Sequence, residues 1–269
     1  MDTARPGATP PDVDALLIDI DGVLTVDGQP LPGTVDAFRR LRDAGLPLAL
    51  ATNTTSRSRA SLASSLHDAG FAVEPSDIVT APALTAAYLR EHHAGARCVV
   101  LTSGDVSADL EDITVVDAAD ESVDVVVLGG AGAEFTYAAL DRLFHHLQAG
   151  AALVAMHRNL YWRTGDGLSL DAGAFLLGLE HAAEVTAAVL GKPAPEFFRT
   201  ATAALGVAPP RTLMVGDDLE ADVLGAQHVG LTGVLVRTGK YRAGVEDAHE
   251  ESPDHVLDSF SDLPGLLGL

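Results

Sequence analysis

The feature that most constrains the fold of this chain is a repeated alternation of short apolar runs with longer amphipathic segments. The runs are apolar throughout, which is typical of strands buried on both faces of a parallel sheet. The predicted strands are Ala15–Ile20, Pro47–Thr52, Arg97–Leu101, Val123–Leu128, Ala152–Met156, Thr186–Leu190, Arg211–Val215 and Gly233–Val236. The predicted helices are Thr34–Ala44, Ser58–Ala69, Ala83–His92, Tyr137–Ala149, Phe175–Glu184, Glu196–Leu205 and Leu219–His228. This alternation predicts βαβ units and an α/β fold with a mostly parallel sheet.

Polar residues follow four of the predicted strands. They are Asp19 and Asp21, Thr52 and Asn53, Lys192 in a Gly-Lys-Pro segment, and Asp217 and Asp218. Ligands of open α/β sheets bind at the carboxyl ends of the strands, so we expect these four loops to converge. Residues 82–185 supply none of these groups but have predicted strands and helices of their own. We therefore interpret them as an inserted domain, which leaves residues 1–81 and 186–269 as the core domain.

The residue types in these loops indicate phosphoryl transfer. Asp19 and Asp21, beside a further acidic pair, would repel one another unless a cation lay between them, and carboxylate oxygens suit Mg²⁺. Thr52 and Lys192 offer a hydroxyl and a positive charge to an anionic group. An aspartate such as Asp19 can act as a nucleophile that becomes phosphorylated, and Asp21 can move protons. Phosphoryl transfer depends mainly on this kind of positioning and charge neutralisation.

The segments DIDGVL, TN, GKP and GDDLEAD, in this order, resemble the four motifs of the haloacid dehalogenase (HAD) superfamily. The long segment between the second and third motifs resembles the C2-type cap of the class IIA, NagD-like branch. The resemblance runs from about Asp14 to the end of the chain. It implies a Rossmann-like parallel-sheet core with an inserted α/β C2-type cap domain, and a Mg²⁺-dependent phosphatase.

The same resemblance implies a role for each motif residue. Asp19 would be the nucleophile and Asp21 the general acid and base. Thr52 and the backbone amide of Asn53 would hold the phosphoryl oxygens. Lys192 would stabilise both Asp19 and the transferred group.

For the metal, the resemblance implies three ligands and two supporting residues. The ligands would be the Asp19 side chain, the Asp21 backbone carbonyl and the Asp217 side chain. Asp218 and Asp222 would lie near the ion, through water or as hydrogen-bond acceptors around the ligands.

The segment MHRNLYW departs from the Asn-Pro-Asp segment of many NagD-like caps, so we do not expect NagD-type nucleotide specificity. Its neighbourhood is rich in cationic and aromatic residues: His157, Arg158, Tyr161, Trp162 and Arg163. These residues fit two interpretations, a structural loop with scattered cations or a group that contacts the leaving group of the substrate. Asp166 and Asp171 are further candidates for contacts with a substrate amine or hydroxyl.

Composition narrows the range of partners. The net charge of −21 argues against nucleic-acid binding and requires a locally positive region for an anionic substrate. No apolar run reaches the roughly 18 residues that span a bilayer, and residues 1–14 lack the regions of a signal peptide. We expect a cytoplasmic protein without membrane contact. The single cysteine, Cys98, excludes an internal disulfide.

The favoured hypothesis is a Mg²⁺-dependent phosphatase that hydrolyses a small phosphorylated metabolite through an aspartyl-phosphate. A phosphomutase or phosphotransferase on the same scaffold is one alternative. A non-catalytic phosphoacceptor or binding protein is another, although receiver domains are about half as long and lack an insert. The resemblance also implies a homodimer formed through the cap.

Overall fold

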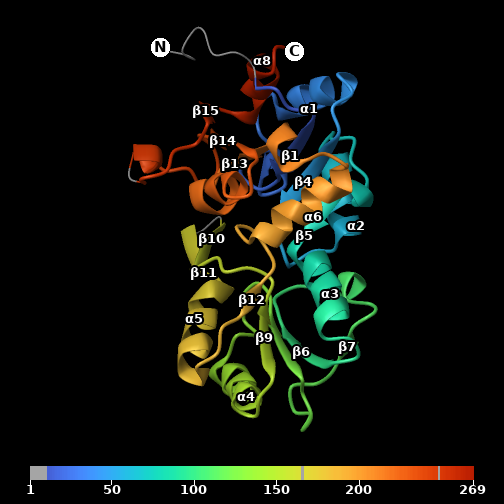
Figure 1. The fold of residues 1–269 in the computed structure, drawn as a ribbon, viewed down its shortest axis with the longest axis vertical. Helices are drawn as coiled ribbons and strands as arrows, with labels where there is room; N and C mark the ends of the chain where they lie inside the picture. Colours follow the sequence, from blue (N-terminus) through green and yellow to red (C-terminus); the bar gives the residue numbers. More distant parts are fainter. Residues whose placement is uncertain (1–10, 165–166, 248) are drawn as a thin grey trace. The chain divides into compact units, whose positions relative to one another are not determined.

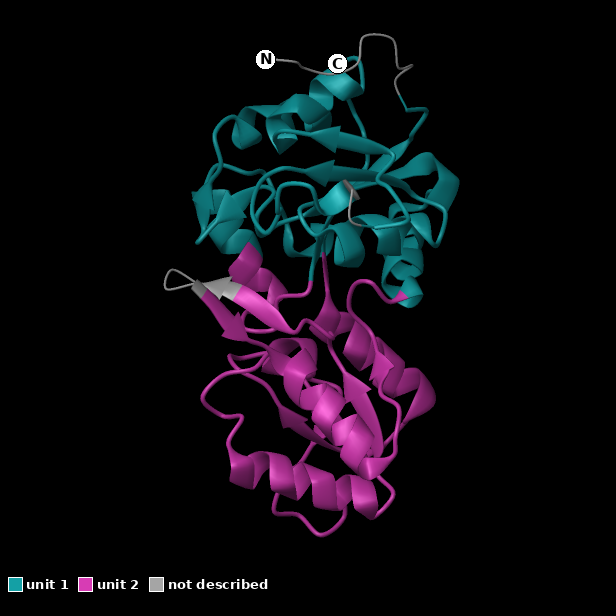
Figure 2. Cartoon of the chain, turned by 90° about the vertical axis from the view of Figure 1, so that its left-hand side faces the viewer, with its two compact units in different colours: residues 1–52, 63–78, 195–269 teal, residues 53–62, 79–194 magenta. Residues whose placement is uncertain are grey.

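The computed structural model describes residues 11–164, 167–247 and 249–269, which form two compact units (Figure 2). Unit 1 contains the chain up to Thr52 together with residues 63–78 and 195–269. Unit 2 contains residues 53–62 and 79–194. The expected insert, residues 82–185, lies inside the second segment of unit 2, and its boundaries stay a prediction.

Unit 1 is built on a six-stranded sheet with the order β15-β14-β13-β1-β4-β5 (Figure 1). The strands are β1 (Ala15–Asp19), β4 (Leu48–Thr52), β5 (Ile78–Thr80), β13 (Thr212–Gly216), β14 (Thr232–Val236) and β15 (His255–Leu257). Parallel pairing joins β15, β14, β13, β1 and β4 in turn. Every residue of β1, β4 and β13 is buried. Because successive side chains of a strand point to opposite faces, both faces of the sheet are covered here, and the strands are apolar throughout.

The helices of unit 1 flank this sheet. They are α1 (Thr34–Asp43), α2 (Arg59–Asp68, which begins in unit 2), α6 (Pro195–Leu205), α7 (Gly225–Gln227) and α8 (Leu263–Leu266). Short helical turns are η1 (Pro75–Asp77), η3 (Pro209–Arg211), η4 (Leu219–Leu224), η5 (Val245–Asp247) and η6 (Phe260–Asp262), and a small hairpin joins β2 (Thr25–Val26) to β3 (Gln29–Pro30). Helix α6 packs on β1 and β4 and buries Phe197 and Phe198 completely. Two fully buried phenylalanines explain why α6 stays on the sheet, since burial of each contributes about 1.5–3 kcal/mol.

Unit 2 has its own parallel sheet with the order β12-β9-β8-β6-β7 (Figure 1). The strands are β6 (Arg97–Leu101), β7 (Thr114–Val115), β8 (Val125–Leu128), β9 (Ala152–Ala155) and β12 (Ala188–Val189). Alternate residues of β8 serve two separate cores. Val126 and Leu128 pack with α4 (Tyr137–Gln148) and α5 (Ala172–Ala183), whereas Val125 and Val127 pack with α3 (Ala81–His92). Unit 2 is therefore a three-layer α/β/α structure.

Two of these helices begin at side-chain caps of the usual kind. Thr80 Oγ1 accepts the Ala83 N–H before α3, and Thr136 Oγ1 accepts the Ala139 N–H before α4. Another short helical turn, η2 (Ser107–Asp109), lies between β6 and β7. Among the described residues, no helix combines the length and apolar character needed to cross a bilayer.

The predicted parallel α/β fold is confirmed, and each predicted strand overlaps an observed one. The segment predicted as helix Leu219–His228 is a π-helical turn followed by the short α7. A hairpin of β10 (Tyr161–Thr164) and β11 (Gly167–Leu170) occupies the segment interpreted above as a loop. The Gly-Asp pair between the two runs is a hairpin signal that the sequence analysis did not use.

Candidate active site

Asp19 ends β1, which lies between β13 and β4 in the sheet of unit 1. Its side chain is 6% exposed, and Asp19 is paired in register with Ala51 of β4, the residue before Thr52. The chain then turns sharply, because the Ile20 carbonyl accepts hydrogen bonds from three following backbone amides. Gly22 has a φ of 90° in this turn, and Asp21 is exposed to solvent. The two acids of the first motif therefore have different environments.

Three buried carboxylates meet at this end of the sheet. One carboxylate oxygen from each of Asp19, Asp217 and Asp222 lies within 4.8 Å of the other two. Asp217 directly follows β13, the neighbour of β1, and Asp222 comes from the π-helical turn η4. Gly216 leaves room for this arrangement, since a methyl group there would overlap the Asp222 carboxylate. Buried carboxylates at this spacing repel one another, and a bound cation would relieve that repulsion.

The two supporting acids of the fourth motif have distinct roles in the fold. Asp218 caps η4, because its Oδ1 accepts the Ala221 N–H at 3.0 Å. Asp222 Oδ2 accepts the Asp218 N–H at 3.1 Å, and its carboxylate belongs to the buried group of three. The π-helical turn aims Asp222 inward, consistent with the frequent occurrence of such turns at functional sites.

Asp217 is the acid of this site whose pKa its surroundings change most clearly. Burial, reinforced by the charges of Asp19 and Asp222, raises the pKa of Asp217 well above its ordinary value. Asp217 Oδ1 is buried and has no hydrogen-bond partner among the residues that the structure describes. A buried carboxylate oxygen without a partner is destabilising, and a hard divalent cation would satisfy it. The donor set therefore fits Mg²⁺.

A loop that the sequence analysis did not assign closes over Asp217. It comprises Thr238, Gly239 and Lys240, just after β14. The Lys240 N–H donates to Asp217 Oδ2 at 2.6 Å, and Thr238 Oγ1 donates to the Gly22 carbonyl at 2.5 Å. A methyl group on Gly239 would overlap the Asp217 carboxylate, and so would one on Gly22. The sequence did contain an indication that this loop belongs to the site, because the loop follows the carboxyl end of the predicted strand Gly233–Val236.

Lys240 brings positive charge to this acidic group. Its Nζ lies 3.8 Å from Asp218 Oδ2, and its side chain is about one-third exposed. Burial disfavours the charged ammonium, but the charges of Asp217, Asp218, Asp19 and Asp222 outweigh that effect and raise the pKa of Lys240. Lys240 is therefore a charged partner of the acidic group.

Thr52 and Asn53 lie at the junction of the two units in the chain. Thr52 ends β4 in unit 1 and is buried. Asn53 begins the unit 2 segment and holds the backbone of Lys192 from both sides. Its Oδ1 accepts the Lys192 N–H at 2.8 Å, and its Nδ2 donates to the Lys192 carbonyl at 2.9 Å. The structure thus brings the second and third motifs together through Asn53, and the Lys192 side chain is buried.

The carboxyl ends of the strands in unit 2 also carry polar groups. Lys192, His157 and Gly130 follow the adjacent strands β12, β9 and β8. His157 is buried, its Nδ1 accepts the Asn159 N–H at 3.3 Å, and its Nε2 lies 3.9 Å from Asp171 Oδ2. Asp171 also caps α5 through the Ala172 N–H. His157 and Asp171 therefore form a buried polar pair.

The other cationic and aromatic candidates that the structure describes are either ion-paired or exposed to solvent, unlike the buried His157. Arg158 makes a bidentate ion pair with Glu180 of α5, with both hydrogen bonds at 2.7 Å, and these bonds lower the pKa of Glu180. Tyr161 and Trp162 are exposed on β10. The Arg163 side chain and Asp166 lie outside the described residues. Arg158 is thus positioned by α5, while Tyr161 stays open to solvent.

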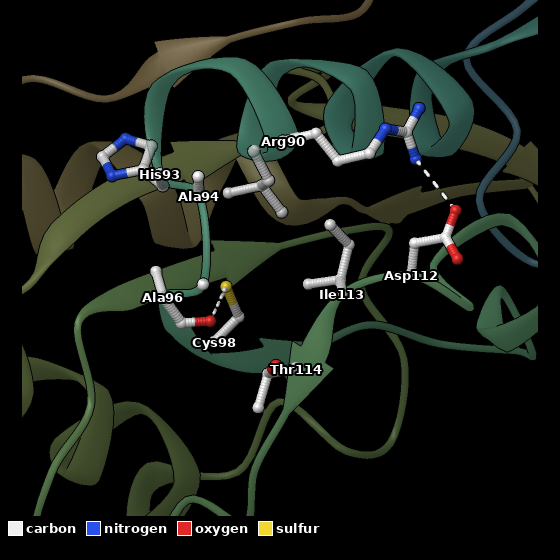
Figure 3. Close-up of a pocket in the computed structure, with 10 residues that line it drawn as sticks. Arg90, His93, Ala94, Ala96, Cys98, Asp112, Ile113 and Thr114 are labelled. Atoms are coloured by element: carbon white, nitrogen blue, oxygen red, sulfur yellow. Dashed lines mark hydrogen bonds and ion pairs between the residues drawn. The ribbon is translucent and has the colours of Figure 1, made fainter.

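A cavity of about 150 Å³ lies at the opposite, amino-terminal edge of the sheet of unit 2 (Figure 3). Cys98 of β6 lines it, with its Sγ 3.6 Å from the Ala96 carbonyl, and Arg90 reaches towards Asp112 at 3.9 Å. Burial, aided by the nearby charge of Asp124, raises the pKa of the Cys98 thiol, which makes it unreactive. The cavity is therefore separate from the polar residues that follow the carboxyl ends of the strands.

Comparisons with known proteins agree with this geometry. Residues 16–115 match the family model described as haloacid dehalogenase-like hydrolase, and residues 189–263 match one described as HAD-hydrolase-like. The chain is 36% identical over 246 residues to haloacid dehalogenase-like hydrolase domain-containing protein 2 from Bos taurus, covering 91% of this chain and 92% of that protein. It is 36% identical over 262 residues to phospholysine phosphohistidine inorganic pyrophosphate phosphatase from Rattus norvegicus, covering 95% and 94%.

Solved structures match nearly the whole chain. NagD from E. coli K-12 has a TM-score of 0.82 and 26% identity, with 93% of this chain and 98% of that chain covered. A glycerol phosphate phosphatase from Mycobacterium tuberculosis, solved in complex with magnesium, has a TM-score of 0.84 and 28% identity, with 94% and 76% covered. Together with the four motifs, these similarities show that the chain belongs to the haloacid dehalogenase-like hydrolases, in the NagD-like branch of that enzyme family.

Proposed function

We propose that this enzyme is a Mg²⁺-dependent phosphatase that hydrolyses a small phosphorylated metabolite through phosphorylated Asp19. The observation that carries the proposal is the buried group of Asp19, Asp217 and Asp222, with Asp21 exposed two residues after Asp19. One similar protein is named a phosphatase of phospholysine, phosphohistidine and pyrophosphate, and another is a glycerol phosphate phosphatase with bound magnesium. Both names support a phosphorylated substrate.

The Mg²⁺ ion would be held by the side chains of Asp19 and Asp217 and by the Asp21 backbone carbonyl. Asp222 would support it directly or through water, and Asp218 would support it from the start of η4. When bound, the ion neutralises the charge that builds up on the phosphoryl oxygens. The oxygen donor set and the unpartnered Asp217 Oδ1 support this assignment.

The reaction would take place in two steps. An Asp19 carboxylate oxygen forms a bond to phosphorus while the bond from phosphorus to the leaving oxygen breaks, and Asp21 gives that oxygen its proton. Asp21 then takes a proton from water, whose oxygen attacks phosphorus and releases inorganic phosphate and free Asp19. The exposure of Asp21 suits a group that exchanges protons with water, and the rigid end of β1 suits a nucleophile.

Thr52, Asn53 and Lys192 would bind the phosphoryl group. In this proposal the Thr52 hydroxyl and the Asn53 backbone amide donate to its oxygens, and the Lys192 ammonium stabilises both Asp19 and the transferred group. The two hydrogen bonds between the Asn53 side chain and the Lys192 backbone support it, because they hold Lys192 in a defined place. A buried lysine that is held in this way is a suitable partner for an anion.

A panel of small phosphoesters and P–N compounds tests the function. We expect Mg²⁺-dependent release of inorganic phosphate and a hydroxylamine-sensitive phosphoryl group on Asp19 during turnover. Phosphate that moves to a second position of the substrate would instead identify a phosphomutase or phosphotransferase. Stable phosphorylation without turnover would indicate a phosphoacceptor protein, and no phosphorylation with any donor would indicate a binding protein.

We further propose that residues 82–185 act as a C2-type cap that selects the substrate. His157 is the strongest candidate for a contact with the leaving group, because it is a buried imidazole at the carboxyl end of β9 next to Asp171. Tyr161 and Arg163 are further candidates. Arg158, which is paired with Glu180, is a candidate for holding the cap in shape.

The substitution His157→Gln tests this proposal, with Arg158→Met as the matched control. We expect His157→Gln to change kcat/KM unequally across leaving groups, by about tenfold for the most affected. Arg158→Met should lower stability by ~1 kcal/mol and leave the order of substrates unchanged. An equal loss across all substrates for His157→Gln would contradict a role in specificity.

Two predictions concern the whole chain in the cell. Pairing of two copies through the cap is implied by the family resemblance, and sedimentation velocity of the full chain would test it. A cytoplasmic location is testable by fractionation. Both stay predictions.

A further inference from the structure

Lysine is rare among the basic residues of this chain, and Lys240 is one of only two lysines in the sequence. The chain has 17 basic residues, and only Lys192 and Lys240 are lysines. A lysine ammonium is a compact point charge, whereas the arginine guanidinium is a broad planar fork, so the two are not interchangeable at close quarters. Lys240 is thus one of two compact positive charges in a chain whose other basic residues are all arginine. Lys192 already has a proposed role in binding the phosphoryl group, whereas Lys240 has none.

The surroundings of Lys240 show what that charge faces. Its Nζ lies 3.8 Å from Asp218 Oδ2, and the aspartates that act electrostatically on it are Asp217, Asp218, Asp19 and Asp222. Its own backbone N–H donates to Asp217 Oδ2, so the main chain of this residue is fixed against the acidic group. The ammonium therefore lies beside Asp218 and feels the charges of the three carboxylates that would take up a metal ion.

We propose that Lys240 is a built-in counter-charge of the acidic group, which stabilises the carboxylates while no metal is bound and thereby limits the affinity for Mg²⁺. This rests on the metal site of the proposed function. The ammonium attracts the negative group of the metal-free protein, and it repels a divalent cation that arrives there. The same charge therefore acts in opposite directions on metal-free stability and on metal affinity.

A counter-charge of this kind would keep the site exchangeable. Buried carboxylates without a cation repel one another, and one oxygen from each of Asp19, Asp217 and Asp222 lies within 4.8 Å of the other two. With Lys240 in place, the site would stay folded without metal and would release Mg²⁺ more readily. Lys240 is thus a positioning and tuning residue and does not contact the reacting atoms.

The substitution Lys240→Met tests the proposal, because it removes the ammonium but keeps the backbone N–H and nearly the same length. Lys240→Arg keeps the charge. Arg39→Met is the matched control, since it changes the net charge equally at an exposed position on α1, where Arg39 forms an ion pair with Asp36. Thermal unfolding in chelator gives metal-free stability, and calorimetric titration with Mg²⁺ gives affinity, both without turnover.

For Lys240→Met we expect a lower midpoint of unfolding in chelator, together with Mg²⁺ binding that is about three- to tenfold tighter than in the wild type. High salt should shrink both differences. Lys240→Arg keeps the charge but not its compact form, so its metal-free stability should lie between that of Lys240→Met and that of the wild type. Arg39→Met should change neither quantity.

Four outcomes would overturn the proposal. Weaker Mg²⁺ binding together with lower stability would mean that Lys240 is only a structural support of the loop. Unchanged Mg²⁺ binding with a loss of affinity for vanadate, a phosphate analogue, would make Lys240 a phosphoryl ligand. A wild-type protein that binds no Mg²⁺ would overturn both this proposal and the metal site, whereas normal wild-type binding with an unchanged variant would overturn this proposal alone.

Discussion

Asp19 and Asp21 show how a spacing of two residues can separate two chemical roles. Asp19 is the last residue of a buried strand and shares its site with two other carboxylates, whereas Asp21 lies beyond the turn and faces solvent. A rigid, buried carboxylate suits attack on phosphorus, and an exposed one suits proton exchange with water. This difference comes from the turn at Ile20 and Gly22, where the backbone leaves the sheet.

The substitution Asp19→Asn tests both the role of Asp19 as the nucleophile and the electrostatic repulsion within the acidic group. We expect kcat to fall at least about a thousandfold, because the amide is not a nucleophile. In chelator, the midpoint of unfolding should rise by about 2–4 °C, since one of three mutually repelling buried charges is removed. Initial-rate kinetics and thermal unfolding measure the two effects. Asp43→Asn, at an exposed acid of α1, should change neither, and retained turnover in Asp19→Asn would refute the mechanism.

The raised pKa of Asp217 predicts a pH dependence of metal-free stability. Because the folded state holds a proton that the unfolded chain has lost, this stability is fully present below the unfolded pKa of about 3.9 and is lost as pH rises through the raised folded pKa. In chelator, the wild type should therefore lose stability relative to Asp217→Asn as pH rises above the unfolded pKa of about 3.9. Urea unfolding at several pH values measures this difference. Saturating Mg²⁺ should reverse it, and a constant difference would contradict the buried carboxylate group.

At the scale of elements, the site of unit 1 is a set of loops that follow adjacent parallel strands. The strands β14, β13, β1 and β4 are neighbours in this order. Asp19 and Thr52 are the last residues of β1 and β4, and the loops after β14 and β13 carry Lys240 and Asp217. A parallel sheet brings these ends to one edge, whatever the distance between the residues along the chain. The loop after β14 belongs to the site because it packs against both Gly22 and Asp217.

The substitution Gly239→Ala tests that packing. Gly239 has a φ of 58°, and a methyl group there would overlap the Asp217 carboxylate. We expect loss of Mg²⁺ binding and a loss of stability above the ~1–2 kcal/mol that left-handed backbone strain alone causes. The matched control is Gly244→Ala, because Gly244 also has a positive φ, 82°, but a methyl group there would meet nothing within 4 Å. Equal effects of the two substitutions on Mg²⁺ binding would show that the loop does not support the site.

Much of this element structure was predictable from sequence because the central strands of both sheets are mainly apolar. Each predicted strand overlaps an observed one, since most residues of a strand that is buried on both faces are apolar. The elements that were missed are short or polar, such as β5, β7, β15 and the hairpin of β10 and β11. The pairing of β7 and β15 depends on strands that lie at a distance along the chain, and local periodicity does not record such contacts.

At the scale of the whole molecule, the net charge of −21 opposes the approach of an anionic substrate. With Mg²⁺ kept saturating, we expect kcat/KM for a dianionic phosphoester to rise about two- to tenfold as ionic strength increases from about 10 mM to about 150 mM, because salt screens this repulsion. Initial rates in KCl measure the effect. Sucrose, which adds no ions, should not reproduce it, and a fall in kcat/KM with salt would show that local cations dominate the field.

The sequence by itself determined the parallel α/β fold, the strand on which each motif is mounted and the chemical types of the site residues. These follow from local properties, namely apolar runs and the residues that end them. Only the tertiary structure decided that Asp222 joins Asp19 and Asp217 while Asp218 caps a helical turn, and that the Lys240 ammonium lies beside Asp218. Such choices depend on a π-helical turn and on close contacts between strands that are remote in the chain, and no local pattern of residues encodes them.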